Sequence, residues 1–251
     1  MPEIIIGRNP VLESLRAGRK IAVISIERSA RSDERLAEIE RLARANQINC
    51  TYVTRGVLDA QTRNAVHQGV VAVASSRPSI SLEDLAAIPT RNAEVPLFVV
   101  LDGIEDPHNL GAILRTCEAT GVHGVVTRSR RAVGLTPAAI KAAAGAAEYV
   151  PLVEVTNVAQ SIEVLKKKNV WIVGIEGSAK GSYLDIDYRP PTAIVVGAEG
   201  QGISALVRKR CDFVASIPMH GKITSLNASV ATGVVLYEVV RQRDADLVSD
   251  P

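Results

Sequence analysis

The hydrophobic positions of this chain follow two alternating periods, which predict strands interleaved with helices. Short continuous apolar runs, typical of strands buried in a parallel sheet, stand at 97–101 and 193–196. Other segments have apolar residues at helical spacing, such as Leu36, Ile39 and Leu42. We expect strands at 21–26, 50–54, 70–74, 97–101, 124–127, 152–155, 170–175, 193–196 and 213–217, and helices at 10–18, 112–120, 137–147, 158–167, 204–210 and 226–243, with a further helix capped by Ser32. This order is typical of a layered α/β protein.

A proline-rich stretch divides the chain into two predicted domains. Pro78, Pro89 and Pro96 punctuate residues 77–96, where we expect a linker with one helical turn near 82–87. The predicted domains are therefore 1–76 and 97–251. The last helix is apolar on nearly every side as far as Val240, so we expect it to be buried within the chain or against another subunit.

The composition is that of a globular protein. Of the 251 residues, 47% are hydrophobic and 22% are charged, and no apolar run reaches the roughly 18 residues of a membrane span. The first residues lack the basic stretch and cleavage site of a signal peptide, and the three cysteines lie far apart. We expect a cytoplasmic location and no membrane partner.

Positive charge is concentrated in the first predicted domain. The whole chain has a net charge of +2, whereas residues 1–76 hold 11 Lys and Arg against 8 Asp and Glu. Arg8, Arg16, Arg19 and Lys20 lie close together in sequence and are candidate contacts to a nucleic-acid phosphate backbone, although many solvated faces look the same.

Several familiar catalytic sites are missing from the sequence. There is no G-x-S-x-G elbow and no Walker lysine motif, which excludes the hydrolases and nucleotide triphosphatases built on them. The four histidines have no ligand spacing with one another or with the cysteines, so we expect no metal.

Three unusual segments each follow a predicted strand, where ligands of α/β folds bind. The first runs from Leu101 to Gly111 into a helix that carries Arg115. It reads equally as a capped strand-to-helix turn. However, Gly103 and Gly111 allow the backbone to approach a ligand, and Arg115 could present its planar fork to a phosphate or base.

The second and third segments narrow the choice of ligand. Residues 197–202, Gly-Ala-Glu-Gly-Gln-Gly, lack dinucleotide spacing, and Glu199 would repel a pyrophosphate. A cofactor with adenine, ribose and a cation but no phosphate is compatible, as in S-adenosylmethionine. The third segment, 217–227, is polar and ends where Ser225 or Asn227 can cap the last helix, which is also its simplest structural explanation.

Together the segments resemble the three motifs of the SpoU branch of the SPOUT RNA methyltransferases, which methylate a ribose 2′-hydroxyl. The matching positions are Asn109, Gly111, Arg115 and Gly121 in the first motif, residues 197–202 in the second, and 217–219 with 225–231 in the third. Residues 7–13, 67–72 and 145–151 are similar to the subgroup of RlmB-like ribosomal RNA guanosine methyltransferases.

The resemblance implies a small N-terminal α/β RNA-binding domain and a C-terminal α/β domain threaded into a trefoil knot, an exception among folds. It implies S-adenosylmethionine bound near Gly197, Ile217 and Leu226, and a homodimer formed through the C-terminal domain. Asn109, Arg115, Glu199, Ser225 and Asn227 match the catalytic and substrate positions. Arginine stays protonated in proteins, so we expect Arg115 to fix a phosphate and stabilise the developing alkoxide.

The resemblance favours a guanosine of large-subunit (23S) ribosomal RNA as the substrate. Within the same class, a tRNA guanosine or the target of a resistance-type ribosomal RNA methyltransferase are alternatives. From other classes, a non-catalytic RNA-binding or ribosome assembly factor is opposed by the five retained polar residues. A nucleotide-binding oxidoreductase is opposed by the glycine spacing.

Overall fold

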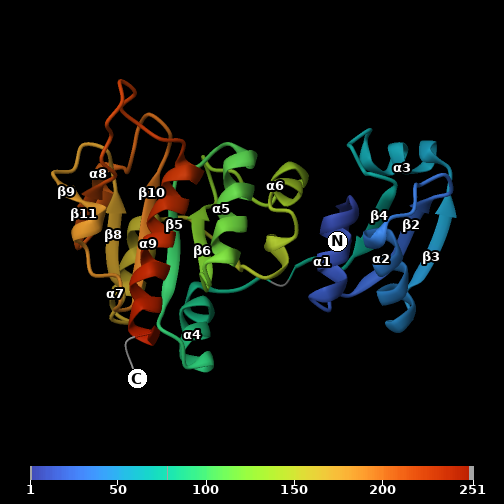
Figure 1. Cartoon of the computed structure of the whole chain (residues 1–251), viewed down its shortest axis with the longest axis horizontal. Helices are drawn as coiled ribbons and strands as arrows, with labels where there is room; N and C mark the ends of the chain where they lie inside the picture. Colours follow the sequence, from blue (N-terminus) through green and yellow to red (C-terminus); the bar gives the residue numbers. More distant parts are fainter. Residues whose placement is uncertain (1, 78, 249–251) are drawn as a thin grey trace.

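The computed structural model describes residues 2–77 and 79–248, which form two α/β lobes (Figure 1). The smaller N-terminal lobe has a four-stranded sheet in the order β1 (Glu3–Ile6), β4 (Val70–Ala74), β2 (Ile21–Glu27) and β3 (Asn49–Val53), with helices α1 (Arg8–Arg16), α2 (Glu34–Ala45) and α3 (Arg55–Thr62). β2 and β3 are parallel, whereas β4 runs antiparallel to both of its neighbours. Asp33, not Ser32, caps α2, because its side chain accepts a 2.9 Å bond from the Leu36 amide.

The larger lobe is built on a seven-stranded parallel sheet. Its order is β7 (Leu152–Val155), β6 (Gly124–Arg128), β5 (Leu97–Asp102), β10 (Thr192–Gly197), β8 (Trp171–Ile175), β11 (Phe213–Ser216) and β9 (Gly181–Ser182). The central strands β5 and β10 are buried along their whole length, which explains their uninterrupted apolar sequences. Because all strands are parallel, the segments that follow them gather at one edge of the sheet.

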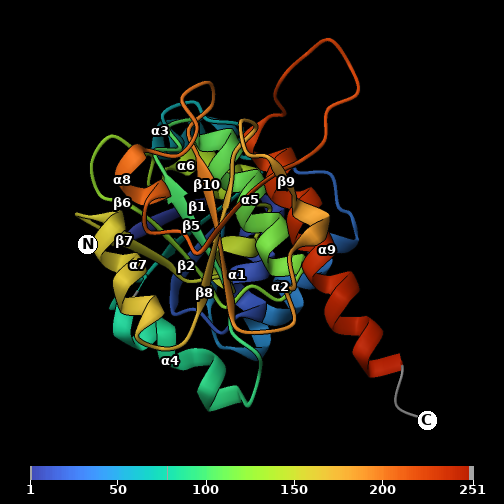
Figure 2. The same ribbon diagram turned by 90° about the vertical axis from the view of Figure 1, so that its left-hand side faces the viewer.

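Helices cover both faces of this sheet. One face carries α5 (Pro107–Ala119), α6 (Pro137–Ala142) and α9 (Ala228–Val248), and the other carries α4 (Leu82–Asn92), α7 (Val158–Lys166) and α8 (Ala205–Arg208). α9 lies beside α5 and extends away from the lobe toward the C-terminus (Figures 1 and 2). α6 ends earlier than expected, because Gly145 turns the chain with a φ of 107° and a short 3₁₀ turn, η1 (Ala146–Glu148), follows.

Residues 77–96 contain more structure than the expected single helical turn. α4 is eleven residues long, and its Leu82, Leu85 and Ala86 are buried in the core under α7. Gly124 of β6 makes room for it, since a Cβ there would lie 2.1 Å from Leu85 Cδ1. The segment from α4 onward therefore packs with the C-terminal lobe, and the domain boundary remains a prediction.

A buried ion-pair cluster joins the two lobes. Glu148 accepts bonds from Arg77 at 2.6 Å, Ser14 at 2.9 Å and Arg19 at 3.0 Å. Glu3 pairs with the same two arginines, and the side chains of Glu148 and Arg19 are only 6% and 8% exposed. Separating the lobes would leave buried charges without their partners, which is costly. These contacts therefore stabilise the observed arrangement of the lobes.

The last helix is partly packed and partly exposed. Val235, Leu236 and Val239 are buried against the larger lobe, whereas Val230 and Tyr237 are 51% and 58% exposed. In the described part of the chain no helix is both long enough and apolar enough to cross a membrane.

Candidate functional site

A cavity of about 550 Å³ opens at the carboxyl edge of the parallel sheet. Residues of four chain segments line it: 175–178, 196–202, 217 with 219, and 224–226 with 228 and 231. Gly197, Ile217 and Leu226, which the sequence places far apart, all lie on its wall. We call this cavity the cofactor cleft. Its outer rim is the loop before α9, which projects from the lobe and is exposed from Pro218 to Asn227 (Figure 2).

Gly197 is needed for the shape of the cleft. A Cβ at this residue would lie 2.0 Å from the carbonyl carbon of Gly202 and 2.4 Å from the amide nitrogen of Ile203. Both contacts are with backbone, so no side chain could move aside. The loop 198–202 is a tight turn closed by the Gly202 amide, which donates a 2.9 Å bond to the Ala198 carbonyl. Gly200 at its tip has a φ of 76°.

The charge of the cleft suits a cation that carries no phosphate. Among the described residues on its wall, Glu176 and Glu199 are acidic and none is Lys, Arg or His. A pyrophosphate would meet the carboxylate of Glu199 and that of Glu176, which is paired with Arg208 at 2.6 Å, whereas a sulfonium or ammonium group would be stabilised by Glu199. The residues present therefore fit S-adenosylmethionine better than a dinucleotide.

The segment 175–178 contributes to the cleft, although the sequence reasoning did not identify it. Glu176, Gly177 and Ser178 follow β8 in the same way that the three motifs follow their strands. Gly177 lies close to the third motif, since a Cβ on it would be 3.6 Å from the Thr224 carbonyl oxygen. The signal was present as a polar, glycine-containing turn at a strand end, but only its place in the sheet shows its importance.

Three of the five predicted catalytic side chains form one hydrogen-bonded network. The Asn109 amide donates to Glu199 Oε1 at 2.8 Å, and the Asn227 amide donates both to the same oxygen at 2.8 Å and to Asn109 Oδ1 at 2.9 Å. Asn109 is 6% exposed at the first turn of α5, after the Asp106 cap. One carboxylate thus fixes two amides that come from segments 118 residues apart.

Asn227 also caps the last helix, which was the simpler explanation of this residue. Its Oδ1 accepts from the Ser229 amide at 2.9 Å and from the Val230 amide at 3.4 Å. The cap and the network use different atoms of the same side chain, so both explanations hold. Ser225 lies on the wall of the cleft and is exposed.

Arg115 is not brought into the cleft of its own chain. It lies six residues after Asn109 on α5, about one and two-thirds turns further on, so the two side chains point to different sides. Arg115 is exposed and makes no hydrogen bond or ion pair with any residue whose side chain the structure describes, 2–77 and 79–244. Its neighbour Thr116 lies against α9, where a Cβ on Gly233 would be 3.7 Å from Thr116 Cγ2.

Gly111 has a packing role instead of the ligand approach expected for it. A Cβ on Gly111 would lie 2.4 Å from Ala142 Cβ and 2.6 Å from the Ala139 carbonyl oxygen. The glycine therefore lets α5 and α6 come into close contact. Gly103, with a φ of 95°, does keep the backbone open beside loop 198–202, where a Cβ would lie 3.6 Å from Ala198 Cβ.

The predicted RNA-binding residues differ in their accessibility. Arg8 pairs with Asp33 at 2.6 Å, and Arg16 pairs with Glu13 and Glu38, of which Glu38 contributes most to raising the pKa of Arg16. Lys20 is exposed. Arg19 is buried between the lobes with its carboxylate partners, which does not fit the RNA contact predicted for it.

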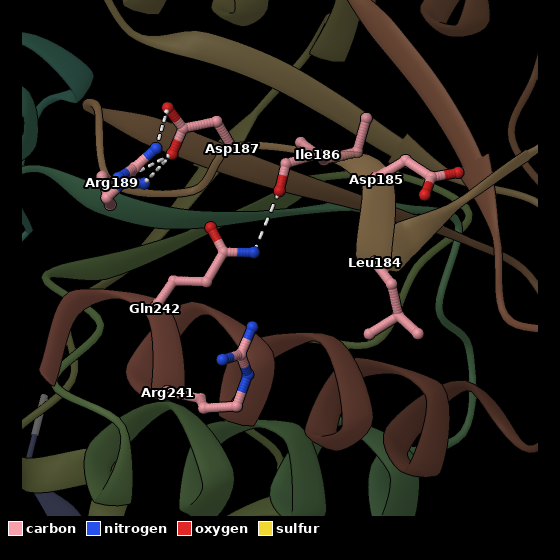
Figure 3. A pocket seen from close by; sticks show the side chains of 7 residues that line it. All are labelled: Leu184, Asp185, Ile186, Asp187, Arg189, Arg241 and Gln242. Atoms are coloured by element: carbon pink, nitrogen blue, oxygen red, sulfur yellow. Dashed lines mark hydrogen bonds and ion pairs between the residues drawn. The ribbon is translucent and has the colours of Figure 1, made fainter. Parts of the chain in front are cut away.

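A further hollow lies away from this edge, beside the C-terminal part of α9. Figure 3 shows its lining, Leu184–Asp187, Arg189, Arg241 and Gln242. Arg189 pairs with Asp187 at 2.8 Å, and the Gln242 amide donates to the Ile186 carbonyl at 3.0 Å. Arg241 pairs with Glu238 of the same helix at 2.7 Å. The bond from Gln242 therefore ties α9 to the segment before β10, and the charged groups of the hollow already have partners.

Comparisons with known proteins agree with this geometry. Residues 96–237 match the model of the SpoU rRNA Methylase family, and residues 4–79 match that of the RNA 2′-O ribose methyltransferase substrate binding domain. The chain is 43% identical over 242 residues to YacO of Bacillus subtilis, whose description names a TrmH family tRNA/rRNA methyltransferase, with 96% of each chain covered. It is also 43% identical over 243 residues to the 23S rRNA (guanosine-2′-O-)-methyltransferase RlmB of Yersinia pestis, covering 97% of this chain and 98% of that one.

A solved structure extends the likeness to three dimensions. The SpoU methyltransferase AviRb from Streptomyces viridochromogenes, in complex with the cofactor AdoMet, has a TM-score of 0.82 and 26% identity, and the match covers 97% of this chain and 91% of that chain. The predicted fold class, a small α/β domain followed by an α/β methyltransferase domain, is confirmed. Since one family model matches more than half of the chain and relatives match nearly all of it, the chain belongs to the SpoU rRNA methylase family.

Proposed function

We propose that this protein transfers the methyl group of S-adenosylmethionine to the ribose 2′-hydroxyl of a guanosine in 23S ribosomal RNA. The observation that carries the proposal is the Asn109–Glu199–Asn227 network, which stands at the border of a cleft with two carboxylates and no basic wall residue among those described. The RlmB relative supports the substrate, and AviRb, which is described with bound AdoMet, supports the cofactor.

The network would orient the reacting groups. Bound S-adenosylmethionine supplies an electrophilic methyl group on a sulfonium. Glu199 holds the amides of Asn109 and Asn227 in fixed directions, so the site needs little reorganisation when the ribose enters. Holding the hydroxyl in line with the methyl group supplies much of the rate, because positioned reactants avoid an entropic cost.

Arg115 would act as a cation in this reaction. A guanidinium stays protonated, so it would bind the phosphate next to the target ribose and stabilise the developing alkoxide instead of removing the proton. A substrate phosphate oxygen is then available as the proton acceptor. The absence of a carboxylate partner for Arg115 in the described residues leaves its fork free for this contact.

A homodimer formed through the C-terminal domain is part of the proposal. Val230 and Tyr237 expose apolar surface on α9, and Leu226 at its start is 37% exposed. Because Arg115 lies next to the Thr116–Gly233 contact between α5 and α9, a second chain on this side would come near it. Light scattering is expected to show a dimer that Val230→Asp converts to monomer, and a wild-type monomer would contradict this part.

The N-terminal lobe would hold the RNA, since its family model is a substrate-binding domain. Arg8, Arg16 and Lys20 remain its predicted RNA contacts, and the cytoplasmic location remains a prediction too.

The competing substrate is a tRNA guanosine, because the relative YacO is named as a tRNA/rRNA methyltransferase and so is assigned to neither RNA alone. Methyl transfer from labelled cofactor should be compared on full-length 23S ribosomal RNA transcripts and on unmodified tRNA. We expect incorporation into 23S RNA; incorporation into tRNA alone would shift the assignment, and no incorporation into either would favour a non-catalytic assembly factor.

A further inference from the structure

A second cavity, of about 440 Å³, is lined, like the cofactor cleft, by residues of loop 198–202. The two cavities share Ala198, Glu199, Gln201 and Gly202 as a common wall. Asn109 lies on the wall of the second cavity and Glu199 on the walls of both, so two members of the network border this space. Its volume is within the range of small-ligand pockets, which is roughly 300–1,000 Å³.

Some of the charge in this second cavity is committed to the fold. Asp102, whose side chain is fully buried at the end of β5, pairs with Arg128 and accepts from the Ser204 amide at 2.8 Å. Asp106 uses one oxygen to cap α5, accepting from the His108 amide at 2.9 Å. These contacts build the wall and leave Arg128 neutralised.

Two opposite charges in the same cavity have no partner. Glu105 and Arg131 both line it and are exposed, and neither makes a hydrogen bond or ion pair with any residue whose side chain is described. Backbone contact brings their loops together, because the Val133 amide donates to the Ile104 carbonyl at 2.9 Å. An unpaired acceptor and an unpaired bidentate donor therefore face one space beside the network.

We propose, on the basis of the proposed function, that this second cavity receives the guanine base of the target nucleotide. Guanine carries two adjacent donors, N1–H and N2–H₂, which match the carboxylate of Glu105. On its other edge O6 and N7 accept a bidentate pair of bonds from an arginine such as Arg131. A base taken out of its stack is commonly read in this way by its hydrogen-bonding edge.

The same pair of side chains disfavours adenine. Adenine has an unprotonated N1 acceptor where guanine has a donor, so the Glu105 carboxylate would meet a lone pair. Adenine also places an amino donor where guanine has O6, which an arginine cannot accept from. With the base in the second cavity, its ribose would lie toward Asn109, which lines this cavity, and Glu199, which lines both.

Binding of mononucleotides tests this assignment directly. Equilibrium dialysis with labelled GMP, IMP or AMP would give the dissociation constant of each nucleotide. The protein would be saturated with S-adenosylhomocysteine throughout. We expect GMP to bind at least fivefold more tightly than AMP, in the range of roughly five- to hundredfold that a bidentate base contact gives. IMP, which lacks the 2-amino group, should fall between them.

Variants separate the two side chains from general charge effects. Glu105→Gln and Arg131→Ala should each weaken GMP binding fivefold or more while leaving AMP binding unchanged. Arg130→Ala, an adjacent exposed arginine outside the cavity lining, and Glu118→Gln, an exposed acid at the other end of α5, serve as matched controls and should change neither. Circular dichroism confirms that each variant is folded, and the two variants test the site independently.

Equal affinity for GMP and AMP, or GMP binding indifferent to both variants, would overturn the guanine site. Methyl transfer to 23S RNA, measured in parallel, reports on the proposed function by itself. Transfer without a GMP preference removes only this inference, whereas a GMP preference without transfer removes the enzymatic assignment and leaves the base site standing.

Discussion

Gly197→Ala is expected to damage the cofactor cleft while the rest of the fold stays intact. The added Cβ would lie 2.0 Å and 2.1 Å from the carbonyl carbon and oxygen of Gly202, whereas ordinary contact is 3.4–4 Å. Loop 198–202 must therefore retreat by more than 1 Å, because all the atoms in the way are backbone. A cofactor that loses two hydrogen bonds to this loop, at about 1 kcal/mol each, binds roughly thirtyfold more weakly.

The effect on turnover should be larger than the effect on binding. A displacement of about 1 Å at a reacting centre costs on the order of a hundredfold in rate, so methyl transfer at saturating cofactor should fall by about that factor. Calorimetric titration with S-adenosylhomocysteine gives the binding constant, and labelled methyl transfer gives the rate.

Gly221→Ala is the matched control for this substitution. Gly221 lies in the loop before α9, has no heavy atom within 4 Å of an added Cβ, and is not among the glycines with a positive φ. It should bind the cofactor as wild type does. If Gly197→Ala also binds it with wild-type affinity and melts at the same temperature, the account of the cleft is wrong.

Three further predictions concern Arg115, the ion pairs between the lobes, and the pH dependence of stability. Arg115→Lys should lower turnover at saturating RNA at least tenfold, because an ammonium lacks the bidentate fork; near-full turnover would rule that role out. Glu148→Gln should lower the free energy of unfolding by about 3 kcal/mol in a urea titration, since Arg19 and Arg77 lose their most buried carboxylate and keep Glu3, and an unchanged midpoint would contradict it. Burial, then the bond to Glu13, raises the pKa of Tyr149 to about 12, so stability should fall as pH rises from 10 toward 12. Tyr149→Phe should show a smaller fall, because buried groups such as Cys211 also have raised pKa values, and an identical pH profile in both proteins would refute it.

The strands of the larger lobe could be predicted from the sequence because the sheet is covered on both faces. Residues 97–101 and 193–196 are apolar without interruption, and each is extended by one polar or small residue at the carboxyl end, Asp102 and Gly197. Those added residues lie on the walls of the two cavities. α4 was underestimated because Pro89 interrupts its pattern, although Ser81 caps it and donates to Asp84 at 2.6 Å, a signal the sequence does contain.

The sequence identified Asn109, Glu199 and Asn227 as candidates, but it could not predict how they contact one another. The three motifs follow strands that turn out to be neighbours or near neighbours, so Asn109, Glu199 and Asn227 meet at one edge. Sequence order says nothing about which strands adjoin, which is why segment 175–178 was not recognised. It also could not show that Arg115 points away from its own cleft, or that Arg19 is buried between the lobes, since both depend on contacts between distant segments.

The most direct test of the central claim is the chemical position of the transferred methyl group. RNA from 23S transcripts methylated with labelled S-adenosylmethionine would be hydrolysed in alkali, which cleaves next to every free 2′-hydroxyl. Methylation of the ribose blocks that cleavage, so we predict that the label appears in an alkali-resistant dinucleotide whose first residue is guanosine. Label recovered in mononucleotides would place the methyl group on a base and contradict the account.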